Sequence, residues 1–194
     1  MFKEETFFIF GGSKSLKKKI WNQKGELIDS IEKSNLNYGR FIESAYIENN
    51  PYILLSGENH SECYVYKNNN IKIYKSQNKN NEHYIVNLFN KNKKIYLITG
   101  DRGGNICIFD FMSTCLLKEI ETGKWIGSLC SINEKYIILS KGNNIVIIDM
   151  DNYSIVKDFT GHNNRGIYGI EKIKILEKGE YLITYDDKSI RIWK

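Results

Sequence analysis

Residues 181–194 read YLITYDDKSIRIWK and hold the pattern that decides the fold. A short apolar run is followed by a polar turn, and then by a segment in which apolar and polar residues alternate up to Trp193. A period of two with β-branched and aromatic residues is typical of a β-strand, so the stretch predicts a β-hairpin. Four earlier stretches have the same design: FFIFGGSKSLKKKIWN at 7–22, YILLSGENHSECYVYK at 52–67, YLITGDRGGNICIFDF at 96–111 and YIILSKGNNIVIIDM at 136–150.

The five hairpins recur with a regular period. Each closes on a large residue, and these residues lie 39 to 45 positions apart: Trp21, Tyr66, Phe109, Ile148 and Trp193. A period of about 40–45 residues is typical of β-propellers with four-stranded blades. We therefore predict an all-β fold, a β-propeller of four-stranded antiparallel blades, in a single domain. The domain covers residues 1–194, with approximate repeats at 1–25, 26–69, 70–112, 113–151 and 152–194.

Two further strands are expected between successive hairpins. In the C-terminal half we place outer strands at 115–120 and 154–159, and inner strands at 125–129 and 167–175. On this plan the chain begins at the second strand of one blade and stops after the third strand of a fifth. That gives about four and a half blades in an incomplete, open ring. Three completions remain open: missing sequence, if the chain is the C-terminal part of a larger propeller; residues 1–6, closing a five-bladed ring; or another chain.

Gly161-His162, followed 31 residues after the histidine by Trp193, resembles the Gly-His and Trp-Asp signature of a WD40 repeat. The likeness covers essentially the whole chain and is strongest in its C-terminal half. The resemblance implies a buried hydrogen-bond network in the last repeat. In that network Asp187 bonds His162, His162 bonds Ser189, and Ser189 accepts the indole N–H of Trp193.

The other repeats depart from this pattern. The third has Gly103, Asn105 and Phe109 at the positions of the acid, the hydroxyl residue and the tryptophan. The fourth has Ile148 at the tryptophan position. We therefore expect the full network only in the last repeat, and apolar packing between sheets in the others.

Ser189, His162 and Asp187 are also the residue types of a catalytic triad. In the implied network the serine is buried and occupied by the indole, so we expect His162 to be structural and name no catalytic residue. A propeller enzyme would need several acids or histidines at the central channel. The inner strands offer mainly Glu43, Ser44, Asn87 and Glu171. This set is thin, so we predict that the chain is not an enzyme.

Composition narrows the classes of ligand. The chain has 28 Lys and Arg against 23 Asp and Glu, a net charge of +5, but its lysines are spread along the whole sequence. Nucleic acid is therefore not the partner we expect.

The spacing of the four cysteines fits neither a metal site nor a disulfide framework: Cys63, Cys107, Cys115 and Cys130. We expect each to be a small buried residue, and we expect an intracellular protein, in the cytoplasm with the nucleus not excluded. No apolar stretch is long enough to cross a bilayer. We expect no metal, no cofactor and no membrane contact.

The resemblance predicts a non-enzymatic scaffold that binds protein partners of unknown identity. A nucleic-acid-associated WD40 protein is the alternative, and a propeller enzyme is the less favoured one. The strand order places five residues on the rim where such propellers usually meet their partners: Arg102, Lys124, Trp125, Asn163 and Arg165. An exposed tryptophan beside arginine is a typical binding hot spot. Trp125 is equally compatible with a half-buried place at the start of an inner strand.

Overall fold

The computed structural model describes residues 7–10, 17–22, 24–32, 39–47, 50–57, 62–67, 70–76, 83–162, 166–175 and 179–193. Within these ranges all regular secondary structure is β-strand, and the strands form five antiparallel sheets.

The first sheet holds β1 (Phe7–Phe10), β2 (Lys17–Asn22) and β3 (Leu27–Glu32). The second holds β4 (Gly39–Ile47), β5 (Asn50–Gly57), β6 (Glu62–Lys67) and β7 (Asn70–Lys75). The third holds β8 (His83–Lys91), β9 (Lys94–Asp101), β10 (Asn105–Asp110) and β11 (Leu116–Glu121). The fourth holds β12 (Leu129–Ser131), β13 (Tyr136–Lys141), β14 (Asn144–Asp149) and β15 (Ser154–Thr160). The fifth holds β16 (Gly169–Ile175), β17 (Gly179–Tyr185) and β18 (Ile190–Trp193).

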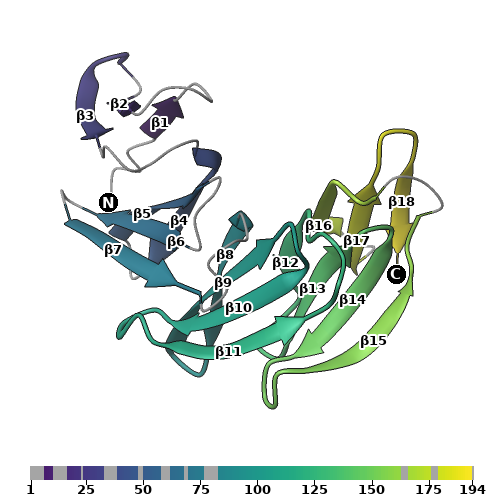
Figure 1. Ribbon diagram of the computed structural model, residues 1–194. Helices are drawn as coiled ribbons and strands as arrows, with labels where there is room; N and C mark the ends of the chain where they lie inside the picture. Colours follow the sequence, from purple (N-terminus) through teal and green to yellow (C-terminus); the bar gives the residue numbers. More distant parts are fainter. Residues whose placement is uncertain are drawn as a thin grey trace.

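The sheets follow one another along an arc, and each pairs its strands in chain order (Figure 1). From the second sheet to the fifth, neighbouring sheets meet through their first strands, because β8 contacts both β4 and β12, and β12 contacts β16. These first strands are therefore the inner strands, and β11 and β15, which are largely exposed, are outer strands. In the described part of the chain the sheets do not close into a ring. The predicted all-β architecture, an open propeller of four-stranded antiparallel blades, is confirmed.

Sequence repeats and sheets are offset by one strand. Each repeat after the first holds the outer strand of one blade and the first three strands of the next. Residues 113–151, for example, contain β11 of the third blade and β12 to β14 of the fourth. The offset links each blade covalently to its neighbour through the connection between an outer and an inner strand.

Strand β10 shows why the middle strands are apolar on both faces. Ile106 and Ile108 belong to a core cluster shared with the fourth blade, while Cys107 and Phe109 belong to a cluster shared with the second blade. Successive side chains of a strand point to opposite faces, so a strand between two blades must be apolar at every position. All four side chains are fully buried.

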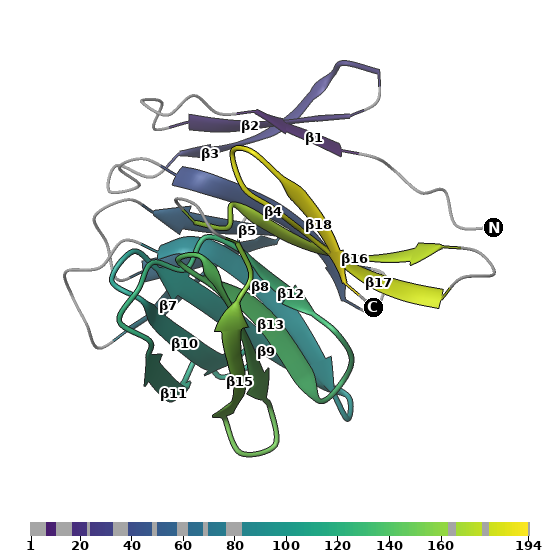
Figure 2. The ribbon, with the colours of Figure 1, turned by 90° about the vertical axis from the view of Figure 1, so that its right-hand side faces the viewer.

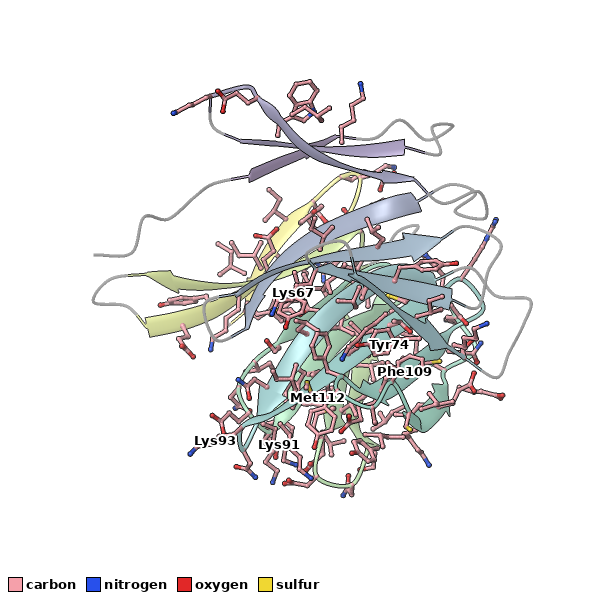
Figure 3. All side chains as sticks on the ribbon, turned by 90° about the vertical axis from the view of Figure 1, so that its left-hand side faces the viewer. Lys67, Tyr74, Lys91, Lys93, Phe109 and Met112 are labelled. Carbon is pink, nitrogen blue, oxygen red and sulfur yellow. The ribbon has the colours of Figure 1, made fainter. Side chains whose placement is uncertain are left out.

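The second and third blades meet through aromatic side chains (Figure 3). The Tyr74 ring packs edge-on against Phe109, with ring centroids 5.6 Å apart, and stacks on Phe111 at 6.2 Å. The Tyr74 hydroxyl donates a hydrogen bond of 2.8 Å to the backbone oxygen of Phe111. Lys72 Nζ donates to the backbone oxygen of Met112 at 3.2 Å. The outer strand β7 thus holds the turn that follows β10.

The predicted inner strand at 125–129 is wrong in its placement. The strand β12 begins only at Leu129, and residues 125–128 form a loop. Their backbone N–H groups bind elsewhere: Ile126 donates to Asp101 O at 3.1 Å, and Gly127 donates to Ser140 Oγ at 2.9 Å. Amides engaged in this way cannot continue the ladder with β13, so the strand starts later.

The cysteine prediction holds in part. Cys63 and Cys107 are buried, where burial raises the pKa of each thiol, and Cys130 is half-buried. Cys115 is exposed, so the expectation of a buried residue there is wrong. It lies in the turn between β10 and β11. Among the described residues no helix is long and apolar enough to span a membrane.

Candidate functional site

His162 lies in the connection between β15 and β16, which joins the fourth and fifth blades (Figure 2). Its side chain has no exposed surface. Nε2 lies 2.8 Å from Thr184 Oγ1, and Nδ1 lies 3.0 Å from Ser189 Oγ. Thr184 Oγ1 also accepts the indole N–H of Trp193 at 2.8 Å. Because this hydroxyl already accepts from the indole, we assign its own hydrogen to His162 Nε2 and a proton to Nδ1.

Asp186 provides the carboxylate of the network. Its Oδ1 accepts from the backbone N–H of Lys188 at 2.9 Å and from the backbone N–H and hydroxyl of Ser189 at 2.6 and 2.9 Å. Its Oδ2 lies 3.0 Å from His162 Nδ1. The Lys188 N–H, with smaller contributions from Ser189 and His162, lowers the pKa of Asp186 to about 2. A carboxylate surrounded by donors stays charged even though its side chain is buried.

Two of the predicted network positions are wrong. The acid is Asp186, because the exposed Asp187 points away from the histidine. The acceptor of the indole is Thr184 on β17, and not Ser189. Ser189 lies four residues before Trp193 along an extended strand, a distance of about 13 Å, so its hydroxyl cannot reach the indole.

The alternation along β17 explains this register. Thr184 and Asp186 are two residues apart, so both point to the same buried side, while Tyr185 and Asp187 between and after them point outward. The polar residues Thr184 and Asp186, spaced by two beside a buried histidine, were the sequence signal for the correct set. The cluster joins the β15–β16 connection to the last hairpin, and its histidine is closed to solvent.

The third blade keeps part of the same arrangement. Asp101, at the position of Asp186, accepts from the backbone N–H of Asn105 at 2.7 Å and from its amide Nδ2 at 2.8 Å. The acid of this repeat is therefore Asp101, and the expectation that Gly103 replaces it is wrong. Thr99 takes the place of Thr184, but its buried hydroxyl finds no hydrogen-bond partner among the described residues.

In the fourth blade a lysine replaces the acid of the network, and the carboxylate comes from the outer strand. Lys141 stands at the position of the acid, and its Nζ lies 2.7 Å from Asp158 Oδ2 on the outer strand β15. Asn144 Nδ2 donates to the other oxygen of Asp158 at 2.8 Å. The side-chain bond from Lys141 contributes most to the lowered pKa of Asp158. This hairpin is thus fastened to the outer strand through Lys141 and Asn144, while Ser140 and Gly142 bind the preceding connection.

Three of the five predicted rim residues, Arg102, Lys124 and Trp125, lie at one end of the blades. We define the loop rim as the connections and turns at 102–104, 122–128, 142–143, 161–162, 166–168 and 186–189. Backbone hydrogen bonds link its segments in series: Gly142 N donates to Trp125 O at 2.8 Å, and Ile167 N donates to Gly142 O at 2.8 Å. Arg102 and Lys124 are exposed on this rim, and Trp125 is half-buried. Asn163 and Arg165 lie outside the described residues.

Trp125 lies over the junction of the fourth and fifth blades. Its ring packs edge-on against Tyr168, with centroids 5.7 Å apart. A Cβ at Gly127 would lie 2.7 Å from Trp125 Cη2, and one at Gly166 would lie 3.1 Å from Cζ3. Gly166 also has a φ of +132°, which side-chain-bearing residues rarely adopt. The indole therefore rests directly on backbone, which only glycine at these positions allows.

Tyr168 extends this aromatic surface and was missed in the sequence. Tyr185 was also missed, and it lies on the opposite face of the fifth blade, on the same side as the exposed Ile190 and Ile192. Tyr168 is 46% exposed and Tyr185 is 39% exposed. The Tyr168 N–H donates to Tyr185 O at 2.9 Å, and the Tyr185 ring covers Gly169, where a Cβ would lie 2.1 Å from Cε1. We call Trp125 and Tyr168 the aromatic cluster. In the sequence Gly169 follows Tyr168, and Ile126, which is buried, follows Trp125. These neighbours were the available sequence signal for the two rings.

No metal centre is found at the rim or elsewhere in the described ranges, where no three His, Cys, Asp or Glu side chains are grouped to hold an ion. The described rim therefore offers aromatic faces, exposed cations and backbone groups. Such a surface suits the binding of a macromolecule by contact.

The comparisons with known proteins agree with this fold. The sequence matches no family model and no curated protein. The structure is similar to the Dos1 propeller, with a TM-score of 0.76 and 14% identity over 97% of this chain and 52% of that chain. It is also similar to the WD40 β-propeller domain of Doa1, with a TM-score of 0.69 and 16% identity over 92% of this chain and 57% of that chain. The chain thus has the fold of a WD40 β-propeller and spans little more than half the length of these structures.

Proposed function

We propose that this chain is a non-enzymatic scaffold that binds a protein partner through its loop rim, at the junction of the fourth and fifth blades. The observation that carries the proposal is the aromatic cluster. The Tyr168 ring is 46% exposed, and the Trp125 ring rests on glycine backbone between two blades. Large aromatic side chains held rigidly at a surface are typical centres of protein interfaces.

The polar chemistry of the fifth blade supports a binding role over a catalytic one. His162 is closed to solvent, and its ring nitrogens face Thr184 and Ser189. The Ser189 hydroxyl donates to Asp186, so it is not available to attack a substrate. This polar network holds the loop rim in place.

Affinity capture from native cells, read by mass spectrometry, tests the proposal. The wild-type chain is compared with Tyr168→Ala, which removes an exposed ring from the cluster, and with Met112→Ala. Met112 is 72% exposed and lies in the β10–β11 turn at the opposite end of the blades (Figure 3), so it is the matched control.

We expect the wild-type chain and Met112→Ala to recover the same partners, and Tyr168→Ala to lose them while its circular dichroism and thermal midpoint stay unchanged. Two results contradict the proposal. One is the absence of any reproducible partner, and the other is full recovery of the partners by Tyr168→Ala.

A further inference from the structure

We infer that two copies of this chain form a closed dimer, in which the first blade of each copy packs onto the open face of the fifth blade of the other. The inference concerns surfaces other than the loop rim, so it does not depend on the partner proposed above. It follows from an apolar pattern that recurs from blade to blade and remains uncovered at the fifth.

The third strand of each of the last three blades carries two isoleucines on the side that faces the next blade. These equivalent pairs are Ile106 and Ile108 on β10, Ile145 and Ile147 on β14, and Ile190 and Ile192 on β18. In the third and fourth blades the next blade covers the pair, and Ile106 and Ile145 have no exposed surface. In the fifth blade Ile190 is 73% exposed and Ile192 is 62% exposed. The fifth blade thus has the face of a blade that another blade covers.

The large residue that closes the third strand of the next blade helps to cover each pair. Ile148 belongs to the core cluster that holds the pair of the third blade, and Trp193 packs against the cluster that holds Ile145. These closing residues face the preceding blade, because successive side chains of a strand point to opposite faces. We therefore expect the closing residue of some other blade to lie over the exposed pair of the fifth.

The first blade offers such a residue at the other end of the arc (Figure 1). In the fourth blade the ladder with the outer strand shifts between Ile147 and the closing Ile148, and in the first blade it shifts between Ile20 and Trp21. Trp21 is therefore the closing residue of the first blade, and its side faces away from the second blade. Its ring is half-buried, with Lys19 Nζ 5.9 Å from the ring centroid.

The open face of the fifth blade suits a largely apolar occupant. Tyr185 lies on this face beside the isoleucine pair, and its ring covers Gly169, where a Cβ would lie 2.1 Å from Cε1. Among the described strand side chains of this face, Glu171 alone is charged. The exposed Lys19 accompanies Trp21 on the first blade, so docking the two faces does not bring like charges together.

A second copy covers both open faces at once. The first and fifth blades of one chain lie at the two ends of an open arc (Figure 1). Because the chain spans little more than half the length of the propellers it resembles, two copies hold about as much chain as one complete ring. Two copies joined head to tail form two identical junctions, and such an assembly is closed by two-fold symmetry.

Analytical ultracentrifugation of the purified chain over a range of concentrations tests the inference. Ile192→Lys places a charge on the open face of the fifth blade, and Trp21→Ala removes the indole from the first. Val156→Lys is the matched control, because Val156 is 51% exposed on β15 and belongs to neither blade. Circular dichroism of each variant checks that it is folded, as we expect for substitutions of exposed side chains.

We expect the wild-type chain and Val156→Lys to sediment as dimers, and Ile192→Lys and Trp21→Ala each to weaken the dimer by about tenfold or more. An equimolar mixture of the two weakened variants should dimerise more strongly than either alone. It retains one intact junction, and the losses of two residues that meet in the other junction do not add.

A wild-type chain that stays monomeric at every concentration would overturn the dimer and leave the face to a blade of another protein or of a longer form of this chain. Open polymers would overturn the closed ring. A dimer that Ile192→Lys abolishes and Trp21→Ala leaves unchanged would overturn the head-to-tail arrangement in favour of two fifth blades packed face to face.

Discussion

At the scale of single residues, Thr184 connects the two halves of the fifth blade's polar network. Its hydroxyl accepts from Trp193 Nε1 at 2.8 Å and lies 2.8 Å from His162 Nε2. Thr99 occupies the equivalent place in the third blade, yet its buried hydroxyl has no partner among the described residues. The two threonines have the same side chain, the same zero exposure and opposite states of hydrogen bonding.

Thr184→Val should therefore lower the free energy of unfolding by about 1–3 kcal/mol, because it leaves the buried polar groups of His162 and Trp193 without their hydrogen-bond partner. Thr99→Val should cost less than about 0.5 kcal/mol or stabilise the fold, because it replaces an unpaired hydroxyl with a methyl group. Urea denaturation of the three proteins measures both effects. Equal losses in the two variants would contradict the assignment of the network.

Asp186 leads to a prediction about pH. Its pKa is lowered to about 2, chiefly by the Lys188 N–H. A carboxyl with a lower pKa in the folded state stabilises the fold above its unfolded pKa of about 3.9, and this contribution is lost as the pH falls from about 4 to about 2. The stability of Asp186→Asn should accordingly depend less on pH in that window than the stability of the wild-type chain.

Urea midpoints measured at several pH values between these limits test this prediction. Asp187→Asn is the control, since that neighbouring carboxylate is exposed and lies outside the network. It should retain the wild-type dependence on pH. A control variant that flattens the curve as much as Asp186→Asn would show that the acid has been assigned to the wrong residue.

The register of this site shows where the sequence was insufficient. The Gly161-His162 pair and the distance to Trp193 identified the histidine and the tryptophan of the network. They did not decide between Asp186 and Asp187, which are adjacent acids in one turn. The decision depends on which of the two shares a face with Thr184, and a strand that ends one residue earlier or later exchanges the faces.

At the scale of elements, the five hairpins were predictable because each combines an apolar run, a turn and a second alternating strand. The short inner strand β12 was not predictable in the same way. Residues 125–128 have strand-like composition, but Ile126 and Gly127 give their N–H groups to Asp101 O and Ser140 Oγ. These are long-range partners, which no local pattern in residues 125–129 could reveal.

The hydrogen bond between β7 and the turn after β10 is a further contact between elements that can be tested. Tyr74 donates to Phe111 O at 2.8 Å from a fully buried position. Tyr74→Phe keeps the ring contacts and removes only this bond, so we expect a loss of about 1 kcal/mol in the free energy of unfolding. Tyr168→Phe, at an exposed ring, should change stability by less than about 0.5 kcal/mol. Denaturant titrations would contradict a stabilising role of this hydrogen bond if Tyr74→Phe were as stable as the wild type.

At the scale of the whole molecule, stability is concentrated where a blade has neighbours on both faces. The middle strands β9, β10, β13 and β14 are largely buried, while the outer strands β11 and β15 are largely exposed. We expect slow amide hydrogen exchange in the middle strands and faster exchange in the outer ones. Exchange followed by mass spectrometry measures this order. Uniform protection across a blade would contradict the arrangement of the sheets.

The open arc could be predicted from the strand count, but the full set of exposed aromatic residues could not. Arg102, Lys124 and Trp125 were placed on the rim from strand order alone, and the structure locates all three there. Tyr168 was missed because its exposure depends on how the fifth blade sits against the fourth. Tyr185 was missed because no described blade covers its face of the fifth blade. Trp125 and Tyr168 belong to different blades and meet only across that junction.

The most direct test of the account is hydroxyl-radical footprinting of the chain, free and bound to its captured partner. Exposed tyrosine, tryptophan and methionine side chains react readily, so the rim and the opposite end of the blades are read in one experiment. The account predicts that the partner protects Tyr168 and leaves Met112 as reactive as in the free chain. Protection of Met112 with unchanged reactivity at Tyr168 would contradict it.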